Sequence, residues 1–223
     1  MRDTRKDKEY FASFLKDQYS DIIDQSAKLS ETKDPGKKQR ILESFVPCYV
    51  DLIKAEFSAG SGKDKLTNLM INTCKAAAEY KENSPETLLI LMSLAIALDK
   101  SNSVKELISK NENLISADRL LSYFAGFLTK GDRKWDNSLR LSPVYAWLDP
   151  VLESVDSEEQ TERLQNYLNY YWYPNHAEYA WYDSHKRDTN TYCGYWSFES
   201  ATLVKILDLD EQDFKGLEYY PAL

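Results

Sequence analysis

Residues 84–98 read SPETLLILMSLAIAL, and this stretch decides the fold class. Ser84 is expected to cap a helix, Pro85 suits its first position, and Glu86 favours the positive end of the helix. The residues that follow are apolar on nearly every side, which is typical of a helix buried at the centre of a protein. The apolar run is about half of the ~20 residues that a bilayer requires, so it predicts a core helix and not a membrane span.

Amphipathic patterns surround this central helix. Apolar residues recur at spacings of three and four within residues 10–23, 41–57 and 66–78, which is typical of helices with one buried face. Further helices are expected near residues 104–108, 114–128, 143–154, 157–171 and 195–207. No stretch alternates with period two, and 7 Gly and 7 Pro are too few for an all-β sandwich or propeller. We therefore predict an all-α bundle of antiparallel helix pairs, with two helical halves packed together.

The two halves differ in charge. Residues 1–110 carry 18 Lys/Arg and 17 Asp/Glu, whereas residues 111–223 carry 10 and 19. Lys130-Gly131-Asp132 is the expected boundary between an amino-terminal helical domain, 1–130, and an acidic, aromatic-rich helical domain, 131–223. An acidic half repels nucleic acid and suits a basic protein partner, so we expect no direct binding to nucleic acid or to a membrane.

Aromatic residues concentrate in the second half. All five Trp lie between residues 135 and 196, and residues 167–196 hold eight Tyr and three Trp. Such rings build either a second helical core or an interface, where Tyr and Trp supply contact area at little entropic cost. Both interpretations stay open at the level of sequence.

The cysteines and the first residues bear on the compartment. Cys48, Cys74 and Cys193 are odd in number and far apart, and no CxxC occurs, so we expect neither a disulfide framework nor a zinc site. Residues 1–9 have no apolar core and do not resemble a secretory signal. These features predict a protein that stays in the reducing cytoplasm.

Motifs for catalysis are incomplete. Residues 60–63, GSGK, lack the spacing and the following Ser/Thr of a phosphate-binding loop. His176-Ala177-Glu178 matches half of a zinc deaminase motif without its cysteine pair. A Cys193–His185 pair has no evident orienting group. We therefore predict no catalytic residue, no metal and no cofactor.

Acidic residues form two clusters in the second half. They are either solvated helix faces or a recognition surface for a basic protein. Six acids fall within fourteen residues without an intervening Lys or Arg, and four more lie near the end of the chain. The members are Asp149, Glu153, Asp156, Glu158, Glu159 and Glu162 in the first cluster, and Asp208, Asp210, Glu211 and Asp213 in the second.

Two motifs and the chain's ending resemble a known family. Residues 181–186 read WYDSHK, residues 192–201 read YCGYWSFESA, and the ending has LDLD at 207–210 and YYP at 219–221. They resemble the carboxy-terminal domain of the PoNe immunity proteins (PoNi), whose pattern is W-Y-x-x-H-K, then Y-x-G-Y-W-S-F-E-x-A-A and Y-Y-P. Residues 55–60 and 91–99 are similar to the amino-terminal domain of that family, with Phe57 in place of a Tyr.

The resemblance implies a function. PoNi proteins neutralise PoNe toxins, which are DNases of the PD-(D/E)xK kind delivered between competing bacteria by type VI secretion and other polymorphic-toxin routes. A protein of this family is expected to be a cytoplasmic, non-catalytic inhibitor that binds the nuclease domain. The acids of both clusters except Asp213, together with Asp183, are then candidate toxin contacts, because a DNase needs a basic groove for DNA phosphates.

The signature residues are expected to be mainly structural. Gly194 is expected to allow a close approach or a turn, Trp196 and Phe198 to pack in the core, and Glu199 to bond His185 or a Tyr hydroxyl or to lie near a helix end. The remaining members of this set are Trp181, His185, Tyr192, Tyr195, Tyr220 and Pro221.

Two other functions remain open. One is a small hydrolase that uses His185 with Glu199 and Asp183. The other is a helical adaptor for a different basic protein.

Overall fold

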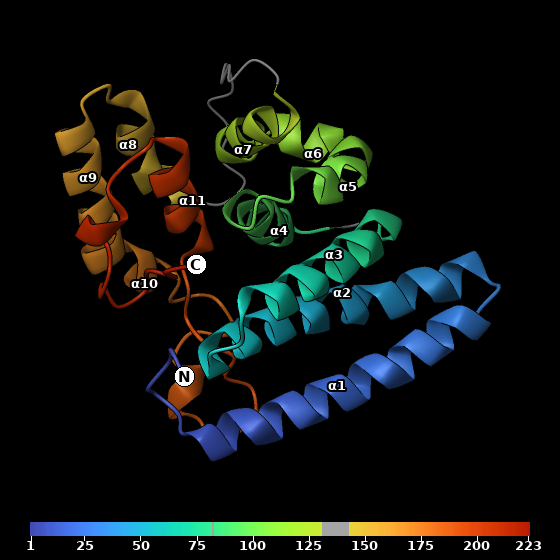
Figure 1. The fold of residues 1–223 in the computed structure, drawn as a ribbon. Helices are drawn as coiled ribbons and strands as arrows, with labels where there is room; N and C mark the ends of the chain where they lie inside the picture. Colours follow the sequence, from blue (N-terminus) through green and yellow to red (C-terminus); the bar gives the residue numbers. More distant parts are fainter. Residues whose placement is uncertain (82, 131–142) are drawn as a thin grey trace.

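The computed structural model describes residues 1–81, 83–130 and 143–223, and every regular element in these ranges is helical (Figure 1). The all-α prediction is confirmed. The α-helices are α1 (Lys8–Glu31), α2 (Pro35–Ala59), α3 (Lys63–Glu79), α4 (Pro85–Ala97), α5 (Lys105–Lys110), α6 (Glu112–Ser116), α7 (Arg119–Thr129), α8 (Asp149–Glu153), α9 (Ser157–Asn166), α10 (Trp172–Asn175) and α11 (Phe198–Ile206). Shorter turns are η1 (Ser101–Val104), η2 (Pro143–Leu148), the π-helical η3 (Tyr167–Tyr171), η4 (Ser184–Lys186) and η5 (Glu211–Asp213). None of the described helices is long and apolar enough to cross a bilayer.

Local sequence sets the ends of the long helices. Asp7, Asp34 and Ser84 cap α1, α2 and α4, and each side chain accepts a hydrogen bond from a backbone N–H of the first turn. The expected cap of the central helix by Ser84 is thus confirmed. Gly60 ends α2 with a φ of 97°, which lies in the left-handed region that glycine tolerates.

Helix α4 lies at the centre of the molecule. Helices α1, α2 and α3 run antiparallel to their neighbours along one side, α7 packs on α4 with α5 and α6 beside it, and α8 to α11 form a group on the other side (Figure 1). Almost every residue of α4 from Leu88 to Ile96 is buried. Because α4 contacts both α7 and α11, one apolar core joins the two halves of the chain.

The first residues of the chain bind the carboxy-terminal aromatic region. Asp3 is buried and accepts a hydrogen bond from the Tyr192 hydroxyl, while Arg5 pairs with Asp3 and Glu218. The Arg5 guanidinium also lies 5.3 Å from the centre of the Tyr195 ring. The two ends of the chain are therefore held together by charge and by aromatic contact.

Several predicted helix bounds were wrong. The last long helix begins at Phe198 and not at residue 195, because residues 192–197 form no regular element and are held to α2 by hydrogen bonds with Ser58. Residues 114–128 form two helices, since Asp118 starts α7 as its cap. Residues 143–154 form the 3₁₀ turn η2 followed by the short α8. The expected boundary at Lys130-Gly131-Asp132, with Trp135, falls largely outside the described residues, so the division into domains 1–130 and 131–223 stays a prediction.

Candidate functional site

The two acidic clusters meet in space. Helix α9 and the segment from Asp208 to Asp213 line one hollow of about 460 Å³ on the surface. Its acids are exposed, and its remaining lining residues are uncharged. We call this the acidic hollow; its five acids are Glu158, Glu162, Asp208, Asp210 and Asp213. Residues about 50 positions apart in sequence thus form one negatively charged surface.

Cations within the chain neutralise other acids of the clusters. Arg119 lies 2.8 Å from Glu153 and 3.7 Å from Asp149. Arg163 pairs with Glu159, and Lys215 lies 3.3 Å from Glu211. The hydrogen bond from Ser154, followed by the ion pair with Arg163, lowers the pKa of Glu159. Such acids have less charge left for a partner.

Three of the predicted acids have local structural tasks. Asp156 caps α9, and Asp210 caps η5 through the N–H of Gln212. Asp183 accepts a 2.7 Å hydrogen bond from the Tyr173 hydroxyl and pairs with Lys186, and these contacts lower its pKa. Within the described ranges, no cation pairs with Glu158, Glu162, Asp208 or Asp213. Asp213, which the sequence motifs did not nominate as a toxin contact, therefore joins the candidates.

The signature segment, residues 192–197, is fixed against α2 by one serine. Ser58 Oγ donates to the Cys193 carbonyl at 2.8 Å and accepts from Trp196 Nε1 at 2.8 Å. Gly194 lies between these contacts with a φ of 114°, and a Cβ there would lie 2.1 Å from Ser58 Oγ. Only glycine fits both the backbone conformation and the space. Ser58 itself carried no signal in the sequence, because a helical serine is common.

Most of the described aromatic rings of the second half are buried in the core or pack against it. Tyr167, Tyr192, Tyr195 and Phe198 are fully or almost fully buried, and the half-buried Trp196 packs edge-on against Phe57. Tyr220 is also buried and packs on Phe214 with ring centres 5.5 Å apart, beside the buried Pro221. Exposed rings in the described part of this half include Trp147 and Tyr170. Core packing thus accounts for most of the aromatic enrichment.

Glu199 is a buried acid with three donors. The Tyr167 hydroxyl, Trp172 Nε1 and the Ser197 hydroxyl donate to its Oε1 at 3.1, 2.7 and 2.6 Å. Burial raises the pKa of Glu199, while these hydrogen bonds oppose the rise. Two of its donors are aromatic side chains, and neither is His185.

The residues of the alternative hydrolase have separate partners. His185 Nδ1 lies 2.9 Å from the Tyr195 hydroxyl, and this hydroxyl donates a hydrogen bond to the Trp181 carbonyl at 3.4 Å. Cys193 is buried, and burial raises the pKa of its thiol. His176 Nδ1 lies 2.6 Å from the Trp172 carbonyl. Among the described residues, no group of three or more His, Cys, Asp and Glu side chains is placed to hold a metal.

Comparisons with known proteins agree with the sequence motifs. Residues 116–222 match the family model described as PoNe immunity proteins (PoNi), C-terminal. The crystal structure of protein PA2201 from Pseudomonas aeruginosa has a similar fold, with a TM-score of 0.77 over 98% of this chain and 88% of that chain at 14% identity. No curated protein matches the sequence significantly. Residues 116–222 of this chain therefore belong to the PoNe immunity protein (PoNi) C-terminal family.

Proposed function

We propose that this protein is an immunity protein that binds and neutralises a PoNe-type DNase toxin of interbacterial competition. The observation that carries the proposal is the family match over residues 116–222. Type VI secretion, or another polymorphic-toxin route, would deliver such a toxin into neighbouring cells. Because a DNase acts on chromosomal DNA, its inhibitor is needed in the cytoplasm, and it works by stoichiometric binding without catalysis.

We further propose that the acidic hollow faces the DNA-binding groove of the toxin. Glu158, Glu162, Asp208 and Asp213 support this, since they are exposed and no cation of the described chain pairs with them. A DNase groove is basic, so opposite potentials would accelerate association and disfavour wrong partners. Trp147, which is 45% exposed and stacks on Tyr171, is a candidate anchor that would slow dissociation.

Co-expression tests the function. The chain is produced together with a catalytically competent PoNe-type toxin encoded beside its gene, and survival, chromosomal DNA integrity and co-purification are scored. We expect survival, intact DNA and a stoichiometric complex. Cell death with no complex would contradict the proposal, and protection without a complex would favour an enzyme.

Charge reversal tests the binding surface. We expect Glu158→Lys/Glu162→Lys/Asp208→Lys to slow association at low salt by about tenfold and to flatten its salt dependence, because exposed charges act on encounter. The matched control, Asp21→Lys/Asp24→Lys/Glu43→Lys, changes net charge equally at exposed positions on α1 and α2. Equal rates for both variants would place recognition elsewhere, such as a steric block beside the active site.

A further inference from the structure

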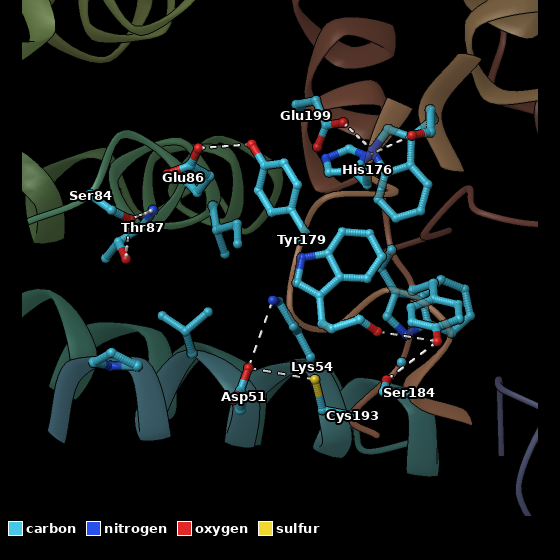
Figure 2. Close-up of a pocket in the computed structure, with 18 of the residues that line it drawn as sticks. Asp51, Lys54, Ser84, Glu86, Thr87, His176, Tyr179, Ser184, Cys193 and Glu199 are labelled. Atoms are coloured by element: carbon cyan, nitrogen blue, oxygen red, sulfur yellow. Dashed lines mark hydrogen bonds and ion pairs between the residues drawn. The ribbon is translucent and has the colours of Figure 1, made fainter. Parts of the chain in front are cut away.

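A second cavity lies between the two halves of the molecule. It has a volume of about 300 Å³ and is bounded by α2 between Pro47 and Lys54, the start of α4, and the aromatic segment from Trp172 to Trp196 (Figure 2). This volume is at the lower end of the ~300–1,000 Å³ that is usual for small-molecule sites. We call it the aromatic cavity.

Hydrogen-bond acceptors dominate the polar lining of the aromatic cavity. Glu86 enters from α4 and accepts the Tyr179 hydroxyl at 3.0 Å, and Asp51 enters from α2. Glu199 enters from α11 with its three donors on Oε1, and no side chain of the described residues donates to its Oε2. Lys54 is the one cation among the described lining residues, and it lies 3.8 Å from Asp51. Three carboxylates thus face one ammonium.

His176 adds another acceptor. Its side chain lines the cavity although the residue is only 2% exposed. Because Nδ1 lies 2.6 Å from the Trp172 carbonyl, which can only accept, Nδ1 carries the proton. Burial lowers the pKa of His176 to about 4, so the ring is neutral at pH 7 and Nε2 is a bare lone pair. Among the described residues no hydrogen-bond partner of Nε2 is found, so this nitrogen of a cavity-lining side chain is left for a ligand.

The apolar walls are aromatic rings. Trp172 and Trp181 are stacked with centres 5.7 Å apart, and Trp181 lies 5.3 Å from Tyr195. Tyr145, Tyr179 and Trp196 also line the cavity. The faces of such rings attract cations, and Trp attracts them most.

We propose that the aromatic cavity binds an alkylguanidinium group. A guanidinium offers five N–H donors in one plane, which suits acceptors that enter from α2, α4 and α11, and its flat face stacks on Trp and Tyr. An anion would meet Glu86, Asp51 and Glu199, and a neutral apolar ligand would leave His176 Nε2 and Glu199 Oε2 without side-chain donors. The group is either a free small molecule or an arginine side chain of a bound protein.

Butylguanidinium is the probe, and butylurea, which has a similar shape without the charge, is the control ligand. Binding to the full chain is measured by calorimetry and by tryptophan fluorescence, since Trp172, Trp181 and Trp196 line the cavity. We expect saturable binding of butylguanidinium with a fluorescence change and no binding of butylurea. Equal affinity for both ligands, or no binding of butylguanidinium, would overturn the proposal.

Variants locate the site. Glu199→Gln and Glu86→Gln each replace a carboxylate by an amide, which removes the charge but still offers one acceptor oxygen. Each variant is therefore expected to weaken butylguanidinium binding about tenfold. Glu158→Gln removes an equal charge in the acidic hollow and leaves the affinity unchanged. If Glu199→Gln fails to fold by circular dichroism, the half-buried Glu86 decides the question. The proposal would be overturned if folded Glu86→Gln binds butylguanidinium as tightly as the parent protein, and Glu199→Gln, where it folds, does so too.

A competition experiment distinguishes the two sources of the guanidinium. If the toxin of the proposed function displaces butylguanidinium, the natural occupant is an arginine of that toxin; if the probe stays bound in the complex, the occupant is a free small cation. Both results support a guanidinium site. A toxin that does not bind at all contradicts the proposed function and leaves the probe measurement standing.

Discussion

Glu199 and Glu158 occupy the same helical position in two contrasting regions. Each lies in the first turn of its helix, where a carboxylate favours the positive helix end. Glu199 is 3% exposed and accepts three hydrogen bonds, whereas Glu158 is exposed in the acidic hollow and has no cation partner among the described residues. Helical position is thus the same, and packing alone decides whether an acid serves the fold or remains available to a partner.

The contrast predicts different consequences of substitution. Substitution of a buried carboxylate leaves its Tyr and Trp donors without an acceptor, which lowers the free energy of unfolding. An exposed carboxylate contributes little to stability but sets the potential that a partner meets. The following changes test this contrast, from the largest expected effect to the smallest.

The largest effect on stability is expected at Gly194, in the signature segment, residues 192–197. Gly194→Ala places a Cβ 2.1 Å from Ser58 Oγ on a backbone with a φ of 114°. We expect the free energy of unfolding to fall by about 4 kcal/mol, because backbone strain and overlap add. Gly216→Ala, with a φ of 91° and nothing within 4 Å, is the control and should lose only the strain, about 1–2 kcal/mol. Equal losses in chemical denaturation would show that the close approach at Ser58 is unimportant.

Glu199→Ala tests the buried acid directly. It leaves the Tyr167 hydroxyl and Trp172 Nε1 without their acceptor, so we expect a loss of about 3 kcal/mol in the free energy of unfolding. Glu158→Ala is the matched change at the equivalent position of α9 and should cost less than about 1 kcal/mol. Thermal or urea unfolding measures both. If the two variants lose equal stability, burial does not separate these acids.

The burial of His176 also predicts that the free energy of unfolding depends on pH. Burial lowers the pKa of His176 from 6.5 to about 4, so between these values the unfolded chain binds a proton that the folded protein does not. The free energy of unfolding should therefore fall by about 2 kcal/mol as the pH falls from 6.5 to about 4.5. His176→Gln should remove this contribution, while His185→Gln should keep it. An identical slope in parent and His176→Gln, from urea titrations across that range, would contradict the assignment.

The smallest effect on stability is expected in the acidic hollow. Glu158→Lys/Glu162→Lys/Asp208→Lys replaces exposed side chains without a cation partner in the described structure, so unfolding free energy should change by about 0.5 kcal/mol per site or less. A loss comparable with that of Glu199→Ala would mean that these acids belong to the fold. If the variant is as stable as the parent protein, a slower association with the toxin is due to the changed surface charge and not to misfolding.

Local features of the sequence account for the fold class and for several helix starts. Residues 84–98 predicted the central helix and its cap, and three- and four-residue spacings predicted α1, α2 and α3. The start of α11 was placed three residues too early, because Tyr195 and Trp196 extend the helical pattern of the apolar residues that follow. Hydrogen bonds of Trp196 and the nearby Cys193 with Ser58, which is more than 130 positions away, hold this segment outside the helix.

Sites formed by distant residues were less accessible to sequence analysis. The two acidic clusters were visible as composition, but their meeting in one hollow and the pairing of Glu153, Glu159 and Glu211 with cations were not. His176 was considered only as a possible metal ligand, and Glu86 only as a residue at a helix end. Their shared cavity exists only in the folded chain, where α2, α4 and the segment from Trp172 to Trp196 line it together.

The sequence by itself determined what depends on neighbours along the chain: helical periodicity, capping, charge imbalance and a family motif. Tertiary structure decided what depends on burial: which acids are neutralised, which ring nitrogen keeps a lone pair, and which glycine admits no side chain. The physical reason is that periodicity and capping act over a few residues. Desolvation and hydrogen-bond satisfaction depend on every group that packs nearby, from any part of the chain.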